Sequence, residues 1–155
     1  MIVVSVSASG FRPDRRLLRR CEKAVTASER RLVRRRAPSP LCVCVNFIPG
    51  SAMRRLNRYA TGRRGDTDVL SFNFDEPRGR YFFLGEIYIS VGRLKRQASE
   101  YRQSLKAEAA LLFIHGFLHL LGYDHEKGGK HRRLMEAKQS ACFQSVFPLL
   151  SGVRP

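Results

Sequence analysis

Residues 115–125 read His-Gly-Phe-Leu-His-Leu-Leu-Gly-Tyr-Asp-His, and the rest of the chain is best interpreted outward from them. His115 and His119 are four residues apart, so on a helix both imidazoles project from one face and can hold one ion. Gly122 can adopt the left-handed conformation that ends a helix, and the following turn then brings His125 back toward the other two. Three imidazoles and an open fourth position are typical of catalytic zinc sites. We therefore predict one Zn²⁺ per chain, held by His115, His119 and His125.

The concentration of histidine in this segment supports a metal site. A single histidine on a helix is more often a satisfied core residue than a ligand, but this chain has four histidines and three lie in this segment. The fourth, His131, stands among basic residues and is expected at the surface. Asp124 has two interpretations, because it either accepts a hydrogen bond from a ligand imidazole or only shapes the turn.

The spacing H-x-x-x-H-x-x-G-x-x-H is also that of the metzincin zinc proteases. Those enzymes carry a glutamate directly after the first histidine, and it acts as the general base. Here that position is Gly116. Without the carboxylate, peptide hydrolysis by this route lacks its proton acceptor. The sequence therefore predicts a metzincin-like zinc helix that serves a different reaction.

The charge of the chain indicates a polyanionic partner. The chain has 155 residues, 29 of them Lys or Arg and 13 Asp or Glu, which gives a net charge of +16 and a pI near 10.8. Half of this excess lies in residues 12–36, which contain eleven basic and three acidic residues. Such a balance favours nucleic acid as the partner, ahead of an anionic membrane surface.

Cysteine usage and hydropathy predict a soluble cytoplasmic protein. The four cysteines form no C-x-x-C pair and are expected as buried thiols in a reducing compartment. The longest strongly apolar run, residues 109–114, is far shorter than the ~20 residues of a membrane span. No targeting segment is evident at the N-terminus.

Hydrophobic periodicity predicts one α/β (α+β) domain over residues 1–150 and a short tail at residues 151–155. We expect a mixed sheet of four to five strands packed with helices. Pro13 is expected in the first turn of the first helix, and Ser51 and Ser104 are expected as helix N-caps. The expected strands are residues 2–7, 41–48, 69–74 and 81–91, and the expected helices are residues 13–36, 51–59, 92–101, 104–122 and 130–146.

Four blocks of sequence carry a resemblance to a known family. The blocks are residues 56–57 (LN), 67–72 (TDVLSF), 84–87 (LGEI) and 115–125 (HGFLHLLGYDH). The last block fits the signature H-G-x-L-H-L-x-G-Y-D-H at every fixed position, whereas Glu86 stands where the family has aspartate. On these motifs, over residues 41–146, the chain resembles the YbeY family of bacterial endoribonucleases, which are also described as rRNA maturation factors.

The resemblance implies a fold, an activity and partners. The fold would be a single α/β domain with a mixed sheet, and the zinc would be held by His115, His119 and His125. The activity would be a metal-dependent, single-strand-specific endoribonuclease that acts in rRNA processing, including maturation of the 3′ end of 16S rRNA, and in ribosome quality control. The partners would be ribosomal RNA and the small ribosomal subunit.

The chain also departs from the family at a pair of positions near the LN block. Members usually carry a Tyr-Arg pair whose positions here are Ala60 and Thr61. A guanidinium suits phosphate because its planar fork donates bidentately and offsets charge on phosphoryl oxygens. Another arginine of this basic segment is therefore expected to contact the substrate phosphate. The candidates are Arg55, Arg58, Arg63 and Arg64, with Arg58 and Arg63 as the predicted catalytic pair.

Two other functions remain open on the sequence. A non-catalytic, zinc-stabilised, rRNA-binding assembly factor fits the missing arginine, although closed structural zinc sites usually have four protein ligands. A metalloprotease fits the histidine spacing but not Gly116 or the charge. Two side-chain roles also remain open, because Tyr123 either stacks on a base or packs, and Asp68 either lines a cleft or caps a strand. For a nuclease, the attacking group is either a metal-activated water or the RNA 2′-hydroxyl.

Overall fold

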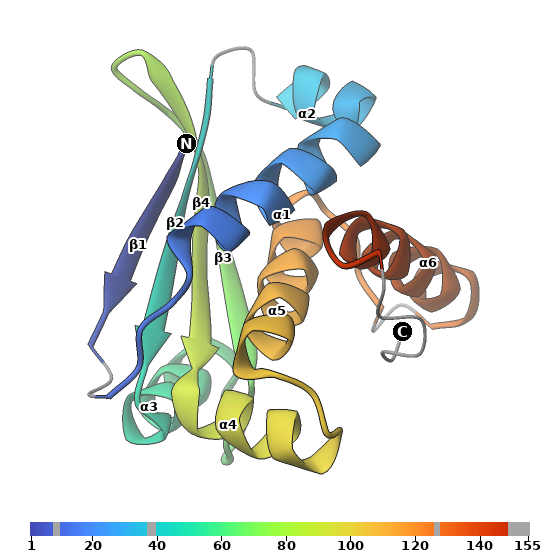
Figure 1. The fold of residues 1–155 in the computed structure, drawn as a ribbon. Coiled ribbons are helices and arrows are strands. Elements are labelled where there is room, and N and C mark those ends of the chain that lie inside the picture. Colours follow the sequence, from blue (N-terminus) through green and yellow to red (C-terminus); the bar gives the residue numbers. More distant parts are fainter. Residues whose placement is uncertain (8–9, 37–39, 126–127, 149–155) are drawn as a thin grey trace.

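The computed structural model describes residues 1–7, 10–36, 40–125 and 128–148 (Figure 1). It contains a four-stranded mixed sheet in the order β1-β2-β4-β3. The pairs β1–β2 and β2–β4 are parallel, and the hairpin β3–β4 is antiparallel. The strands are β1 (Ile2–Val6), β2 (Leu41–Ile48), β3 (Val69–Arg78) and β4 (Tyr81–Ser90). The expected α/β class and mixed sheet are thus confirmed.

The described residues form six helices, of which α1 and α5 lie in front of one face of the sheet and α6 packs against both of them (Figure 1). The short helices α3 and α4 lie together at one end of the sheet. The helices are α1 (Arg15–Ser28), α2 (Arg30–Arg36), α3 (Gly50–Thr61), α4 (Val91–Glu100), α5 (Leu105–Leu120) and α6 (Gly129–Val146). No helix in the described ranges has the length and apolar character needed to cross a membrane.

The core forms around β2, β4 and α5. The central strand β2 is buried almost throughout, as its continuous apolar run predicts. Helix α5 is apolar on nearly all sides and lies between the sheet and α6, which explains why most of its residues are buried. All four cysteines are unbridged thiols, and three of them are buried.

The prediction of a first helix at residues 13–36 is wrong in two details. The helix is broken at Glu29, which ends α1 before α2 begins. It also starts later than expected, because Pro13 precedes the N-cap residue Asp14 instead of occupying the first turn. The Asp14 carboxylate accepts hydrogen bonds from the backbone of Arg16 and Leu17, and this satisfies two of the N–H groups at the helix start.

Two other boundaries differ from the prediction. Strand β3 continues past residue 74 to Arg78, so Pro77 is a strand residue and the turn lies at Gly79, whose φ is 58°. A proline is tolerated there because β3 is an edge strand of the sheet. Helix α3 begins after Pro49, so Ser51 is not its cap, whereas Ser104 caps α5 as predicted. The predicted tail at residues 151–155 lies outside the described residues.

Candidate metal centre

Helix α5 and the turn after it bring the three predicted ligands together. One nitrogen each of His115, His119 and His125 lies within 4.8 Å of the others. The Nε2 atoms of His115 and His119 are 3.0 Å apart. The ring of His125 lies 5.2 Å from that of His115 and 5.1 Å from that of His119, centroid to centroid. This is a compact, three-sided arrangement that could hold a metal ion.

The turn depends on Gly122. Its φ of 96° is a left-handed value that favours glycine, and it ends the helix where the sequence predicts. The Tyr123 amide donates back to the Leu118 carbonyl at 3.0 Å, and the Gly122 amide donates to the His119 carbonyl at 2.9 Å. These bonds reverse the chain within three residues, so that His125 faces the helix it has just left.

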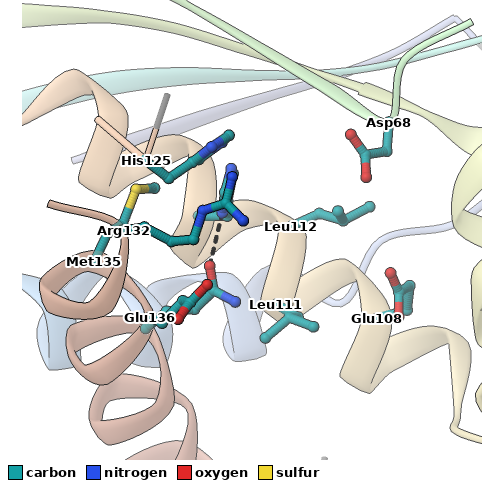
Figure 2. Close-up of a pocket in the computed structure, with 10 residues that line it drawn as sticks. Asp68, Glu108, Leu111, Leu112, His125, Arg132, Met135 and Glu136 are labelled. Carbon is teal, nitrogen blue, oxygen red and sulfur yellow. Dashed lines mark hydrogen bonds between the residues drawn. The ribbon is translucent and has the colours of Figure 1, made fainter. Parts of the chain in front are cut away.

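The orientation of His115 is fixed from α6. Its Nδ1 lies 2.7 Å from Oε1 of Gln139, which is itself buried (Figure 2, dashed line). Because a carboxamide oxygen only accepts hydrogen bonds, Nδ1 carries the proton and Nε2 keeps its lone pair. A metal-ligating histidine usually donates its other N–H to such an acceptor. Gln139 therefore prepares Nε2 of His115 as the ligand atom.

The surroundings of His115 and His119 keep these two imidazoles neutral. Burial, with the neighbouring imidazoles, lowers the pKa of His119 to about 4, and burial also lowers the pKa of His115. Both rings are therefore in the deprotonated form at neutral pH, which is the form that binds a metal.

The position of the missing glutamate is closed by the fold. A Cβ atom on Gly116 would lie 2.6 Å from Cγ2 of Ile87 and 3.0 Å from Oγ of Ser71. The Ser71 hydroxyl also donates to the Gly116 carbonyl at 3.0 Å, and the Asn73 amide donates to the Leu120 carbonyl at 2.7 Å. Helix α5 thus lies directly on β3 and β4, and the carboxylate of a metzincin has no space here.

A cavity of about 570 Å³ opens beside the three imidazoles. Arg63 and Thr61 line it, together with Asp68 and Ser71 from the start of β3. The loop between α3 and β3, residues 62–68, carries Arg63. Asn57 holds this loop in place, because its side-chain amide donates to the Gly65 carbonyl at 3.3 Å. The structure therefore brings one of the two predicted arginines, Arg63, to the metal centre.

The other candidate arginines lie elsewhere. Arg58 is exposed on α3 and is not among the residues that line this cavity; nor are Arg55 and Arg64. At the position of the family arginine, the Thr61 hydroxyl donates to the Asn57 carbonyl at 2.8 Å and accepts from the Arg63 amide at 3.2 Å. The short side chain of Thr61 thus helps hold Arg63 at the cavity.

Tyr123 and Glu29 join the turn after α5 to the N-terminal helices. Glu29 is 6% exposed, and its carboxylate accepts from the Tyr123 hydroxyl at 2.7 Å and pairs with Lys138 at 2.8 Å. Burial opposes ionisation, but the hydrogen bonds from Lys138, Tyr123 and Ser28 outweigh it and lower the pKa of Glu29. Tyr123 therefore packs with its hydroxyl bonded inward, as one of its two sequence interpretations predicts, and it also lines the larger cavity.

Sequence reasoning missed Gln139 and Glu29. Gln139 carried a signal, since it lies on the stripe of α6 that also buries Met135, Cys142 and Phe143. A polar residue in such a stripe has a buried partner, and here that partner is His115. Glu29 carried no comparable signal, because it is one of three acidic residues within a basic stretch.

Comparisons with known proteins match most of the chain. The family model described as "Endoribonuclease YbeY" matches residues 13–146. The chain is 38% identical over 140 residues to the endoribonuclease YbeY of Chloroflexus aggregans, covering 86% of this chain and 88% of that protein. It is 39% identical over 106 residues to that of Persephonella marina, covering 67% and 69%. The solution structure of TM1509 from Thermotoga maritima matches with a TM-score of 0.60 at 26% identity, covering 96% of this chain and 90% of that one.

Proposed function

The chain belongs to the endoribonuclease YbeY family, and from this premise we propose that it is a zinc-dependent endoribonuclease that cleaves single-stranded RNA. The family membership agrees with the resemblance drawn from the four sequence blocks. One observation carries the proposal, namely three imidazoles that converge beside a cavity with an arginine on its wall.

The donor set fits zinc. All three donors are imidazole nitrogens, one of them is oriented by a buried amide, and no fourth protein ligand closes the site among the described residues. Imidazole also suits nickel, copper and iron, so the choice of zinc is part of the proposal. When bound, the ion supplies a Lewis acid that polarises a phosphoryl oxygen.

The residues around the site would hold the RNA backbone. In this proposal the Arg63 guanidinium donates to a phosphate oxygen next to the histidines and offsets the charge that develops there. Arg58, which lies on α3 near its C-terminal end, would contact the RNA backbone farther from the cleaved bond. The Thr61 and Asn57 hydrogen bonds keep the loop in place, so that Arg63 acts from a fixed position.

We further propose ribosomal RNA of the small subunit as the substrate, with maturation of the 3′ end of 16S rRNA and ribosome quality control as the roles, in the cytoplasm. The net charge of +16 supports a large RNA partner. The assembly-factor alternative is not favoured, because the relatives are named as endoribonucleases and the three-histidine set leaves a position open. The protease alternative is not favoured either, because Gly116 stands where a metzincin carries the glutamate that acts as its general base.

Cleavage of single-stranded rRNA tests the proposal. Wild-type protein, His115→Ala and chelator-treated protein are compared, with metal content measured on each sample and folding checked by circular dichroism. We expect cutting by the wild type alone, and recovery of the treated sample on addition of Zn²⁺. Equal cutting by all three samples would indicate a contaminant. Binding of rRNA without cutting by the zinc-loaded wild type would support the assembly factor instead.

A further inference from the structure

A second, smaller cavity lies next to the histidine cluster (Figure 2). Its volume is about 250 Å³, and it shares His115, His125 and Asp68 with the larger cavity. The candidate metal site therefore borders both cavities. A group bound in the smaller one would be next to any phosphate held at the histidines.

The smaller cavity has an apolar floor. Helix α5 contributes Leu111 and Leu112, and α6 contributes Met135. Its volume is below the ~300–1,000 Å³ of pockets for drug-sized ligands. Its size suits one flat ring system with polar edges, and not a whole nucleotide, because polar side chains complete the lining around this floor.

Two charged side chains of α6 face this floor. Arg132 and Glu136 are four residues apart, which puts them on one face of the helix. Figure 2 shows both side chains reaching from α6 into the cavity. Within the described ranges neither the guanidinium nor the carboxylate takes part in a hydrogen bond or an ion pair. The cavity therefore presents a donor fork and an acceptor side by side.

We propose that this cavity binds the base of a nucleotide adjacent to the cleaved phosphate and that Arg132 and Glu136 give it a preference for guanine. The inference rests on the proposed nuclease function. Bases of single-stranded RNA are free to leave the stack and are read on their polar edges by such pockets. Leu111, Leu112 and Met135 would contact the ring faces.

Guanine fits the two charged groups better than the other bases. Its O6 and N7 atoms accept from an arginine fork, which is the most common specific contact to a base. Its N1–H and N2 amino groups donate to a carboxylate. Adenine offers N7 but no O6 to the fork, and uracil offers N3–H but no amino group to the carboxylate, so each makes fewer hydrogen bonds to the two charged groups than guanine does. Cytosine offers an amino donor but no N7 for the fork.

Mapping of cleavage sites tests the preference. A pool of single-stranded RNA with random sequence is cut by the wild type and the fragment ends are sequenced. We expect guanine to be enriched about tenfold at one position beside the cut. Arg132→Ala and Glu136→Gln should reduce this enrichment to below about twofold. Arg133→Ala is the matched control, because Arg133 is exposed on the same helix, lines neither cavity and should leave the enrichment unchanged. Uniform cutting by the wild type, or enrichment that survives both substitutions, would overturn the proposal.

A binding measurement separates this proposal from the nuclease function. The chain has three methionines, of which Met135 lines the cavity and Met53 is buried in α3. With ¹³C-labelled methionine methyl groups, guanosine 5′-monophosphate should shift the Met135 signal, while cytidine 5′-monophosphate at the same concentration should not. The Met53 signal should stay fixed with both nucleotides. A guanine-selective shift would uphold the base site even if RNA were not cut. Equal shifts with both nucleotides, or none, would refute the base site while leaving the nuclease function standing.

Discussion

Two walls line the candidate metal centre, one formed by α5 and the other by residues 61–68. The fold holds the α5 wall more firmly than the other. On α5 the ligands are part of a buried helix whose carbonyls accept hydrogen bonds from Ser71 and Asn73. On the opposite wall, Thr61 and Arg63 are exposed. A ligand on the first wall cannot move without repacking the core, whereas a phosphate contact on the second can be supplied from a neighbouring position. This explains how the chain can keep all three histidines and yet have Thr61 where its family has arginine.

The largest effect is expected on the α5 wall, at the metal ligands. His115→Ala should bring bound zinc to background and reduce RNA cleavage by more than the ~10–100-fold that loss of an outer contact costs. His131→Ala, at the exposed fourth histidine, should leave both unchanged. Metal analysis and cleavage rates measure the outcome. Full zinc content in His115→Ala would show that the cluster does not bind the ion.

Gly116 tests how tightly the same wall is packed. Gly116→Ala places a methyl group against Ile87 and should lower the free energy of unfolding by about 1–3 kcal/mol. Gly92→Ala on α4 is the control, because its Cβ would meet open space, and it should leave stability equal or slightly higher. Urea unfolding compares the two variants. A neutral Gly116→Ala would mean that α5 can move off the sheet.

Gln139 tests whether α6 orients the ligand. Gln139→Leu keeps the side-chain size but removes the acceptor for Nδ1 of His115, so zinc affinity should fall by about 10–100-fold. Gln144→Leu, on the exposed side of the same helix, should leave the affinity unchanged. Competition with a chelator of known affinity gives the measurement. Equal affinities in the two variants would remove the positioning role.

The exposed wall should show smaller and separable effects. Arg63→Ala should weaken RNA binding and lower the slope of log affinity against log salt by about one, as expected for one lost phosphate contact. Arg58→Ala, outside the cavity, should reduce cleavage less than Arg63→Ala does. A greater loss with Arg58→Ala would move the phosphate contact to α3 and would contradict the assignment of Arg63.

The burial of His119 should also make the stability of the metal-free protein depend on pH. The pKa of His119 is lowered to about 4 in the folded protein, whereas an unfolded histidine titrates near 6.5. Between these values the unfolded chain binds more protons, so the free energy of unfolding should fall as the pH is lowered from about 6.5 to 4. Urea midpoints of chelator-treated protein test this. The pH dependence should be weaker in His119→Asn, and an unchanged profile in that variant would assign the effect to other groups.

Features that depend on neighbouring residues could be predicted from the sequence, whereas features that depend on contacts between distant residues could not. The ligand triad and the turn at Gly122 depend on spacing within eleven residues, and β2 and α5 depend on continuous local patterns, so all of them could be predicted. The break at Glu29 could not be predicted, because no glycine or proline marks it and the buried partner of Glu29, Tyr123, lies 94 residues away. The extension of β3 through Pro77 was missed for a similar reason, since it depends on β3 being an edge strand.

The closeness of the three ligands in sequence has a thermodynamic consequence. His115, His119 and His125 span only eleven residues, so the denatured chain keeps a flexible chelating segment that can also bind zinc. A ligand raises the midpoint of thermal unfolding only by its preference for the native over the denatured state. Zinc should therefore raise the midpoint temperature of unfolding by less than the value calculated from the affinity of the native site alone. The preference that remains comes from the distant residues Gln139, Ser71 and Glu29, which support the ligands only after the chain has folded.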